Sequence, residues 1–331
     1  MIVYVSNADG REISVLRLDA SGVLTPVRAV AVDGKVMPLA VSPDRRRLYA
    51  GLRSTPYRVA VFEIESGTGD LVPVATGPLP DNMAYLGVDR SGHYLLSASY
   101  TGDKVAVQRI GGDGAVGEVV QVLATPPHAH SIVADPSNRY VFVGVLGGDT
   151  VWQYRFDGTL TPNAPPFVAT KPGAGPRHIA FHPDGRVVYV SNELDGTVES
   201  FLFDADSGVL DPVTALSVVP PSHAGITPAT SELRVTPDGR YLYVAERVSS
   251  SLACFRVDGA TGALAPCGHT FTETRPRGFA IDPRGRFLVA AGQRTGHVAG
   301  YAIGSGGGLE LVDRRAVGAD PNWVEIVDLN G

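Results

Sequence analysis

Ionisable side chains stand beside short apolar runs at several separate points of the chain, and they could bring acid–base and anion-binding chemistry together in one site. These residues are His130, Arg177, His178, Glu193, Glu232, Arg247 and Arg277. Arginine binds carboxylate or phosphate through two parallel hydrogen bonds and can stabilise an oxyanion or enolate. A carboxylate flanked by histidine can activate water or move a proton. Together these residue types predict acid–base and electrostatic chemistry on a small anion.

A repeated unit determines where these residues lie. One phrase recurs: a short apolar run, a turn written (S/D/T)-P-D-G-R or a variant, and a run rich in Tyr, Val and Leu. Measured at the turn, its copies stand 47, 46, 47, 54 and 46 residues apart, at Pro43, Arg90, Pro136, Pro183, Pro237 and Pro283. Each phrase is typical of a β-hairpin, because proline presets φ while Asp and Gly tolerate the remaining turn dihedrals. A second hairpin follows each copy, as in VAVFEIESGTGDLVPV from Val59.

Four short strands per unit of about 47 residues predict the blade of a β-propeller. One further period after Pro283 reaches Leu329, within VDLNG, and the strand that should follow, IVYVSN from Ile2, stands at the opposite end of the chain. Seven such periods account for the 331 residues. We therefore expect one all-β domain over residues 1–331, a seven-bladed β-propeller with four antiparallel strands per blade. The C-terminal strand and the N-terminal strands would together close the last blade.

The blade register assigns residues to a face of this propeller. The first strand of a blade lines the central channel, and the loops into the first strand and out of the second emerge on one face, the usual ligand face. Met37, Ala84, His130, Arg177, Ser231, Arg277 and Trp323 would start the first strands, each with the residue after it, and Arg53, Tyr100, Leu146, Glu193, Arg247, Gln293 and Ala8 would follow the second strands. A single charged pair at such a place would indicate an ion pair only. The gathering of arginines, histidines and carboxylates in blades three to six indicates a site.

The make-up of this predicted site excludes several kinds of chemistry. Arginines that share a pocket with Glu193 and Glu232 disfavour a divalent metal ion. The sequence has no P-loop and no dinucleotide fingerprint, so we expect no nucleotide cofactor, and indeed no cofactor at all. It also lacks a G-x-S-x-G motif, and neither cysteine falls on the ligand face, so a covalent nucleophile is disfavoured.

Composition narrows the possible partners and location. The formal net charge of −6 offers no basic surface for nucleic acid or for an anionic membrane. No apolar run is long enough to span a bilayer, and Met1 to Gly10 show no export signal. Cys254 and Cys267 are too few for a disulfide framework, so a reducing cytoplasm is the default expectation. We expect a monomer or a weak homo-oligomer.

The motifs around these residues resemble one known family, the propeller-type bacterial 6-phosphogluconolactonases, which share their fold with fungal carboxymuconate lactonising enzymes. The pieces that carry the resemblance are PHAHS from Pro127, GAGPRHIAFHPDG from Gly173, SNEL from Ser191, TPDGRYLYVAER from Thr236 and RPRGFAIDP from Arg275. The resemblance implies that His130, Arg177, Glu193 and Arg247 are the catalytic residues. It implies that the substrate is bound by His178, Arg277, Glu232, Gln293, Asn192 and Arg53, with Arg58 as a weaker phosphate contact.

The sequence departs from this family at one place. The usual Ser-Asn-Arg is here Ala245-Glu246-Arg247. The additional carboxylate of Glu246 could hold Arg247 in place or reshape the substrate pocket.

Three hypotheses follow. The first is a lactonase acting on a sugar-acid lactone, foremost 6-phosphogluconolactone, in which Glu193 or His130 activates water. In this hypothesis Arg177 and Arg247 stabilise the oxyanion, while Arg277 and Arg53 hold the phosphate. The second is a metal-free muconate or carboxymuconate cycloisomerase that uses the same residues. The third is a non-catalytic YVTN-like binding propeller, since YVSN occurs twice in the sequence.

Overall fold

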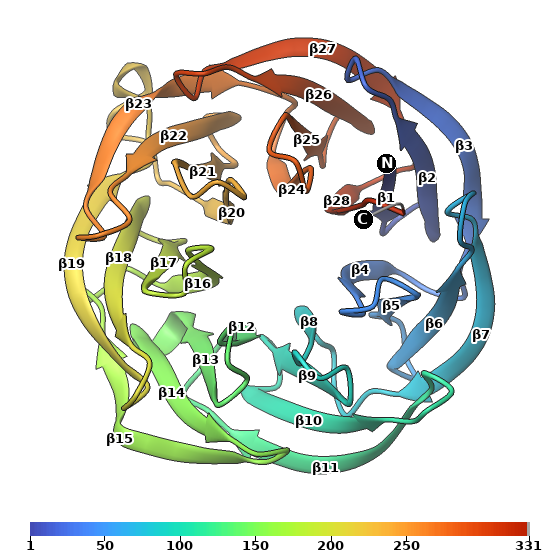
Figure 1. Ribbon diagram of the computed structural model, residues 1–331, viewed down its shortest axis with the longest axis horizontal. Helices are drawn as coiled ribbons and strands as arrows, with labels where there is room; N and C mark the ends of the chain where they lie inside the picture. The colour runs from blue at the N-terminus through green and yellow to red at the C-terminus, as the bar shows by residue number, and fades with distance from the viewer. Residues whose placement is uncertain (330–331) are drawn as a thin grey trace.

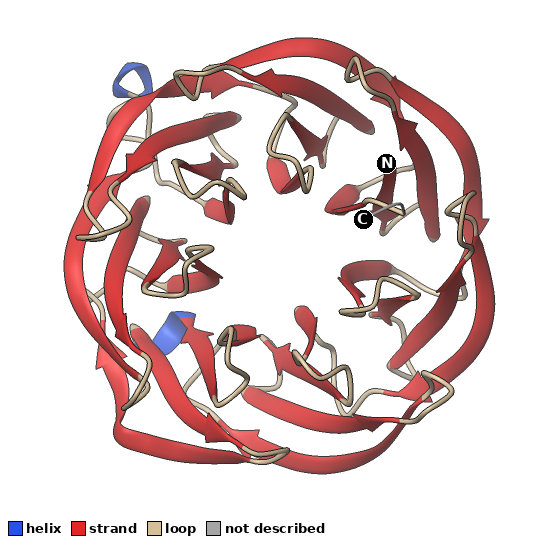
Figure 2. Cartoon of the chain, in the orientation of Figure 1, coloured by secondary structure: helices blue, strands red, loops and turns tan. Residues whose placement is uncertain are grey.

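The chain forms a closed ring of seven four-stranded antiparallel sheets in the computed structural model, which describes residues 1–329 (Figure 1). The sheets stand around a central channel like the blades of a propeller, and no α-helix occurs within the described part of the chain. The only helical segments there are two short 3-10 turns, η1 (Leu146–Gly148) and η2 (Pro221–His223) (Figure 2). The prediction of an all-β, seven-bladed propeller is confirmed.

Each blade contributes one strand to each of four concentric layers. The innermost strands are β4 (Val36–Val41), β8 (Tyr85–Val88), β12 (Ala129–Ala134), β16 (Pro176–Phe181), β20 (Thr230–Val235), β24 (Pro276–Ile281) and β28 (Pro321–Val327). The second strands are β5 (Arg47–Leu52), β9 (Tyr94–Ser99), β13 (Tyr140–Val145), β17 (Val187–Asn192), β21 (Tyr241–Glu246), β25 (Phe287–Gly292) and β1 (Ile2–Asn7). The third strands are β6 (Arg58–Ile64), β10 (Lys104–Ile110), β14 (Thr150–Phe156), β18 (Thr197–Asp204), β22 (Ser251–Val257), β26 (His297–Ile303) and β2 (Glu12–Leu18). The outermost strands are β7 (Leu71–Pro78), β11 (Val116–Ala124), β15 (Leu160–Ala169), β19 (Val209–Ser217), β23 (Leu264–Phe271), β27 (Leu309–Ala316) and β3 (Leu24–Ala31).

Blade 7 joins the two ends of the chain. We number the blades 1 to 6 from β4–β7 to β24–β27, so blade 7 consists of β28 followed by β1, β2 and β3. In this blade β1 pairs with β28, and Ile2 lies opposite Val327 while Tyr4 lies opposite Glu325. The predicted closure of the ring by both chain ends is confirmed. Asn330 and Gly331, which complete the expected last turn, lie outside the described residues.

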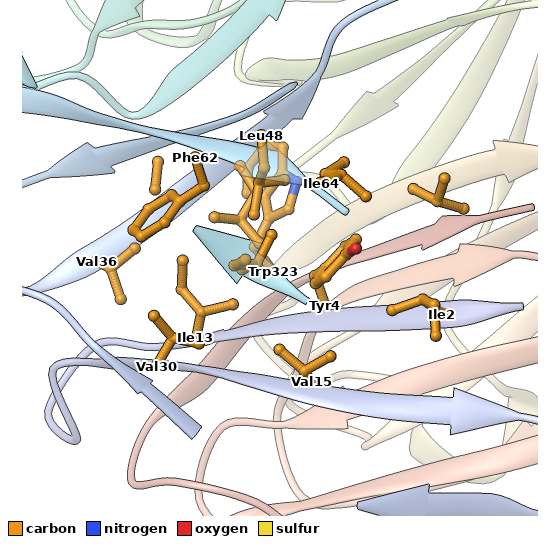
Figure 3. Packing of buried hydrophobic residues seen from close by; sticks show 14 of the residues in the cluster. Ile2, Tyr4, Ile13, Val15, Val30, Val36, Leu48, Phe62, Ile64 and Trp323 are labelled. Atoms are coloured by element: carbon orange, nitrogen blue, oxygen red, sulfur yellow. The ribbon is translucent and has the colours of Figure 1, made fainter. Parts of the chain in front are cut away.

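Apolar side chains fill the space between neighbouring blades. Between blades 7 and 1, Ile2, Tyr4 and Trp323 pack with Leu48 and Phe62, all of them buried (Figure 3). Each of the other blade interfaces holds a comparable cluster. Because apolar burial is the main favourable term in folding, these interfaces keep the ring rigid and fix where each inner strand begins.

The turns between first and second strands follow the predicted turn chemistry. Gly185, Gly239 and Gly285 have φ angles of +76°, +74° and +67°, a left-handed conformation that glycine adopts without a steric penalty. Arg45 and Asn138 take the same place in two other blades with φ angles of +59° and +62°. These turns all lie on the face opposite the predicted ligand face.

The two cysteines depart from the expectation drawn from the sequence. Cys254 in β22 and Cys267 in β23 form a disulfide, with their Cα atoms 5.3 Å apart on adjacent strands. Their number alone gave no hint of this pairing, which depends on a hairpin register that places them side by side. A disulfide is at odds with the reducing compartment that the cysteine count suggested.

Candidate active site

Six of the seven inner strands bulge near their start, and in three of these blades the bulge leaves one predicted site residue unpaired. The pairing of the first strand with the second skips one residue in each of these three, and the skipped residues are His130 in blade 3, Arg177 in blade 4 and Arg277 in blade 6. A β-bulge leaves this residue outside the hydrogen-bond ladder and redirects its side chain. The bulges therefore turn these three side chains away from the positions that a regular strand would give them.

In every blade except blade 2, a backbone hydrogen bond places the end of the second strand beside the start of the first. The N–H of Glu193 donates to the carbonyl oxygen of Gly175 (2.8 Å), and the N–H of Arg247 donates to that of Ala229 (3.2 Å). Arg53 and Gln293 make the same contact in blades 1 and 6. The residues that follow the second strands thus lie next to those that start the first strands, as the register predicts.

Glu193 lies between two arginines at the centre of this arrangement. Arg177 Nε is 2.8 Å from Glu193 Oε2, an ion pair without an aligned hydrogen bond, and Arg247 Nη2 is 2.7 Å from Glu193 Oε1. Arg247 Nε also donates to the carbonyl oxygen of Ala229 at 2.9 Å. Burial alone would raise the pKa of Glu193, but the charges of Arg177 and Arg247 outweigh it and hold that pKa below its ordinary value. Glu193 is therefore an ionised bridge between blades 4 and 5.

Two further arginines have no carboxylate in direct contact. Within residues 1–329, no carboxylate oxygen lies within 4.0 Å of the guanidinium groups of Arg277 or Arg53. Burial lowers the pKa of Arg277, and the positive charges of Arg177 and Arg247 lower it further. Burial also lowers the pKa of Arg53, whose Nε donates to Asn82 Oδ1. With four arginines and Glu193 as their shared carboxylate, this part of the ligand face suits an anion.

Two histidines lie beside the arginines. The rings of His130 and His178 have centroids 5.1 Å apart, and the two residues are 4% and 2% exposed. His178 Nδ1 lies 3.1 Å from Glu232 Oε1. Burial, reinforced by the charge of Arg177, lowers the pKa of His130 well below its usual range and that of His178 to about 4. Both imidazoles are therefore neutral at neutral pH.

Two predicted substrate contacts are not at this cluster. Asn192 Nδ2 donates to Thr197 Oγ1 (2.9 Å) within its own blade, because strand alternation turns it away from the side of Glu193. Arg58 lies on the third strand of blade 1 and pairs with Asp33 at 2.7 Å. The expectation that Asn192 and Arg58 face the substrate is not met by these contacts. Gln293 is half-buried at the end of β25, beside the cluster.

Glu246, the carboxylate that departs from the family pattern, does not pair with Arg247. Its Oε1 accepts the N–H groups of Ala229 (2.7 Å) and Val248 (3.1 Å), and its Oε2 accepts the hydroxyl of Ser249 (2.6 Å). It therefore fixes the two loops around Arg247, including the residue whose carbonyl oxygen holds the guanidinium group.

The sequence reasoning missed one residue of this region and assigned no role to another that it had placed on the ligand face. Arg234 Nη2 lies 3.5 Å from Glu232 Oε2 and 3.8 Å from Glu325 Oε1. The signal was available, because residues two apart on a strand share a face and Glu232 was already placed on the channel side. Tyr100 follows the second strand of blade 2, and its ring centroid lies 5.8 Å from that of His130.

Cavity size does not identify this site. A cavity of about 630 Å³ lies beside the Pro43 turn between blades 1 and 2, and another of about 430 Å³ lies in the channel beside Tyr85, Arg234 and Trp323. Neither is lined by Glu193 or His130. Within residues 1–329, no three His, Cys, Asp or Glu residues gather in a way that could hold a metal ion, and no helix there is long and apolar enough to cross a membrane. The charge and placement of the side chains define the site instead.

Several known proteins resemble this chain over nearly its whole length. Residues 2–326 match the family described as "Lactonase, 7-bladed beta-propeller". The 6-phosphogluconolactonase of Pectobacterium carotovorum subsp. carotovorum (strain PC1) is 40% identical, with 99% of each chain covered. The corresponding protein of Serratia proteamaculans (strain 568) is 38% identical over 98% of each chain. Among solved structures, the Pseudomonas aeruginosa periplasmic gluconolactonase PpgL superposes with a TM-score of 0.92 at 29% identity, covering 99% of both chains. The resemblance seen in the sequence is confirmed, and the chain belongs to the seven-bladed β-propeller lactonases.

Proposed function

We propose that this protein hydrolyses 6-phosphogluconolactone to 6-phosphogluconate. The observation that carries the proposal is the combination, on one face, of a neutral histidine with two arginines that have no carboxylate in direct contact. Such a set can activate water and bind a substrate that carries phosphate. The curated relatives named 6-phosphogluconolactonase support the choice of substrate.

His130 is the better candidate for the general base. A carboxylate whose pKa is held below its ordinary value, as that of Glu193 is, accepts a proton weakly at neutral pH. Glu193 instead keeps Arg177 and Arg247 in place. His130 is neutral, and its Nδ1 is buried and has no partner among the described residues. Its Nε2 is not one of the buried atoms that lack a partner. We therefore assign water activation to His130 Nε2.

The reaction then follows two steps. The oxygen of water attacks the lactone carbonyl while His130 Nε2 takes one of its protons, and a tetrahedral oxyanion forms. The oxyanion collapses, the bond between the carbonyl carbon and the ring oxygen breaks, and His130 returns its proton to that oxygen. Arg177 and Arg247 supply the positive charge that stabilises the oxyanion, and Arg177 Nη1 has no acceptor among the described residues.

Arg277 and Arg53 hold the phosphate in this proposal. Their guanidinium groups are near enough for the charge of Arg53 to lower the pKa of Arg277, and a phosphate between them would relieve that repulsion. A dianionic phosphate thus gains from two cations that have no carboxylate in direct contact.

The test is a comparison of lactones with the rate of spontaneous hydrolysis subtracted. We expect kcat/KM for 6-phosphogluconolactone to exceed that for unphosphorylated gluconolactone by at least about tenfold, the value of one lost charge-assisted contact. His130→Asn should lose turnover, whereas His93→Gln, at an exposed turn on the opposite face, should keep it. No turnover above the spontaneous rate would refute the proposal.

The rival functions are outcomes of the same test. Turnover of a muconolactone in the presence of a chelator, without hydrolysis of a sugar lactone, would identify a metal-free cycloisomerase. A stoichiometric protein partner without any turnover would identify a binding propeller.

We also propose that the protein works in the cytoplasm, since a phosphorylated lactone carries charge that keeps it on the side of a membrane where it is made. The Cys254–Cys267 disulfide should then be reduced in the cell. Alkylation of cysteines in an acid-quenched lysate, followed by mass spectrometry, measures this. Full protection of both residues would place the protein in an oxidising compartment.

A further inference from the structure

Two neighbouring histidines each have a buried nitrogen without a hydrogen-bond partner. His130 starts the inner strand of blade 3 and His178 that of blade 4, and their ring planes make an angle of 62°. His130 Nδ1 and His178 Nε2 are both buried, and neither has a partner among residues 1–329. A buried polar atom left without a partner costs roughly 1–3 kcal/mol, so two such atoms on adjacent rings call for an explanation.

The other nitrogen of His178 determines which of its atoms carries the proton. His178 Nδ1 faces Glu232 Oε1, which also accepts the backbone N–H of Leu233 at 3.0 Å. Burial would raise the pKa of Glu232, but Arg234 and His178 outweigh it and keep that pKa low. An ionised carboxylate can only accept hydrogen bonds. A neutral His178 must therefore carry its proton on Nδ1, which leaves a lone pair on Nε2.

In this structure the two nitrogens form no hydrogen bond with each other either. We propose that a small rotation of the rings, whose centroids lie 5.1 Å apart, lets His178 Nε2 accept a hydrogen bond from His130 Nδ1–H, so that Glu232, His178 and His130 form one chain. The chain pairs both orphaned nitrogens. It also fixes the tautomer of His130, because a proton on Nδ1 leaves the lone pair on Nε2, the atom needed to receive a proton from water. His178 and Glu232 are then positioning residues that act through His130, and the earlier expectation that they bind substrate is replaced.

The chain also accounts for how His130 can work as a base although its surroundings oppose a positive charge. Arg177, Arg277 and Arg247 all lower its pKa, as does burial. When His130 takes a proton from water, the imidazolium donates along the chain toward the negative charge of Glu232, as the aspartate of a serine-protease triad stabilises its histidine. Nδ1–H stays in place and Nε2 later returns its proton to the ring oxygen, so no net proton is gained or lost.

The packing around His178 excludes water from this hydrogen-bond chain and holds its side chains in place. The rings of Tyr85 and Trp323 lie 5.4 and 5.6 Å from that of His178. Arg234 holds Glu232 from the channel side, and Glu325 in turn lies 3.8 Å from Arg234. The charged groups that face the histidine pair are thus Glu232 and four arginines: Arg177, Arg234, Arg247 and Arg277.

The test is nitrogen NMR of the full-length protein labelled in its histidines. His130 is identified by the signal missing from His130→Asn. In the wild type near pH 7.5 we expect both His130 and His178 to carry their proton on Nδ1, with Nε2 unprotonated. In Glu232→Gln the neutral amide can donate as well as accept, so both histidines should become mixtures of tautomers. The kcat should then fall about 100-fold while KM stays within about twofold, since water activation is lost and substrate contacts remain.

Glu273→Gln is the matched control, because Glu273 is another buried carboxylate paired with an arginine, Arg314. It should leave the His130 tautomer and kcat unchanged. A wild-type His130 that carries its proton on Nε2, or a tautomer that Glu232→Gln leaves unchanged, would overturn the proposal, and the wild-type spectrum decides this even if a variant fails to fold. The inference rests on the proposed lactonase function for its consequence in kcat only. A wild type with these tautomers but no lactone turnover would refute that function but not the hydrogen-bond chain of Glu232, His178 and His130.

Discussion

Arg277→Met should make the protein more stable and a worse enzyme, because Arg277 has no carboxylate in direct contact and lies among more positive than negative charge. The guanidinium group is partly buried at a bulge of β24, and the repulsion from Arg177 and Arg247 outweighs the attraction of Glu193. Methionine keeps much of the length and apolar character of the side chain while removing the charge.

The two effects can be estimated separately. A buried ion without compensation carries an effective penalty of several kcal/mol, and since Arg277 is partly exposed we expect about 1–2 kcal/mol of folding free energy to be recovered. For binding, the loss of a charge-assisted hydrogen bond to the phosphate costs about 1.5–3 kcal/mol. The KM for 6-phosphogluconolactone should therefore rise about 10- to 150-fold, with a smaller change in kcat.

Urea unfolding and steady-state kinetics measure the two effects on the same preparation. 6-Phosphogluconate serves as a non-reacting ligand, and it should raise the Tm of the wild type more than that of Arg277→Met because the variant binds it less tightly. Arg294→Met is the matched control, since Arg294 is an exposed arginine in the same blade and its replacement makes the same change in net charge. It should alter neither KM nor the free energy of unfolding appreciably.

Loss of stability in Arg277→Met would show that Arg277 has a structural partner. An unchanged KM would show that it does not contact the substrate. Either result would refute the reasoning from unbalanced charge, and an equal rise in KM for Arg294→Met would reduce the effect to long-range electrostatics.

Three further predictions concern the carboxylate bridge, the histidines and the blade interfaces. Glu193→Gln leaves two buried cations without their carboxylate, so the free energy of unfolding should fall by about 3 kcal/mol and kcat by about 100-fold; full activity would refute the bridge. The pKa of His178 is about 4 in the folded protein, and it is about 6.5 in an unfolded chain. The unfolded state therefore binds more protons between these values, and stability should fall by about 3 kcal/mol as the pH drops from about 6.5 to 4, with a shallower slope in His178→Gln measured by urea unfolding at each pH. Tyr4→Phe removes the hydrogen bond from the Tyr4 hydroxyl to the carbonyl oxygen of Gly69 (2.7 Å) and should cost about 1–2 kcal/mol. Tyr189→Phe, at the equivalent place in blade 4 with an unpartnered hydroxyl, should cost nothing, and equal losses in both would refute this assignment.

The number of blades and the split blade could be predicted from the sequence because the turn between the first and second strands recurs once per blade at a nearly constant spacing. A turn built from proline, aspartate, glycine or their substitutes recurs at each first hairpin, and the spacing of these turns is independent of what the inner strands carry. The same spacing predicted that Glu193 would lie beside Arg177, since both strand ends are counted from one turn. Distances along the chain were enough for these features.

Features that depend on exact register could not be predicted in this way. Asn192 was placed at the site because it precedes Glu193, yet strand alternation turns it toward Thr197. The disulfide depends on the pairing of β22 with β23, which brings Cys254 next to the bulge that contains Cys267. A turn count carries no information about either.

The bulges explain why the chemistry lies at the starts of the inner strands. Elsewhere in a blade the side chains pack against the neighbouring blade, so a charged residue there would have to be buried in an apolar interface. A residue at a bulge lies outside the hydrogen-bond ladder, so a different residue can stand there without disturbing that packing. Blade 2, whose inner strand pairs without a bulge, begins with Ala84 and Tyr85, whereas blades 3, 4 and 6 present His130, Arg177 and Arg277 at their bulges. A bulge therefore permits a charged residue at the start of an inner strand but does not require one, because blades 1 and 7 bulge beside Met37 and at Asn322.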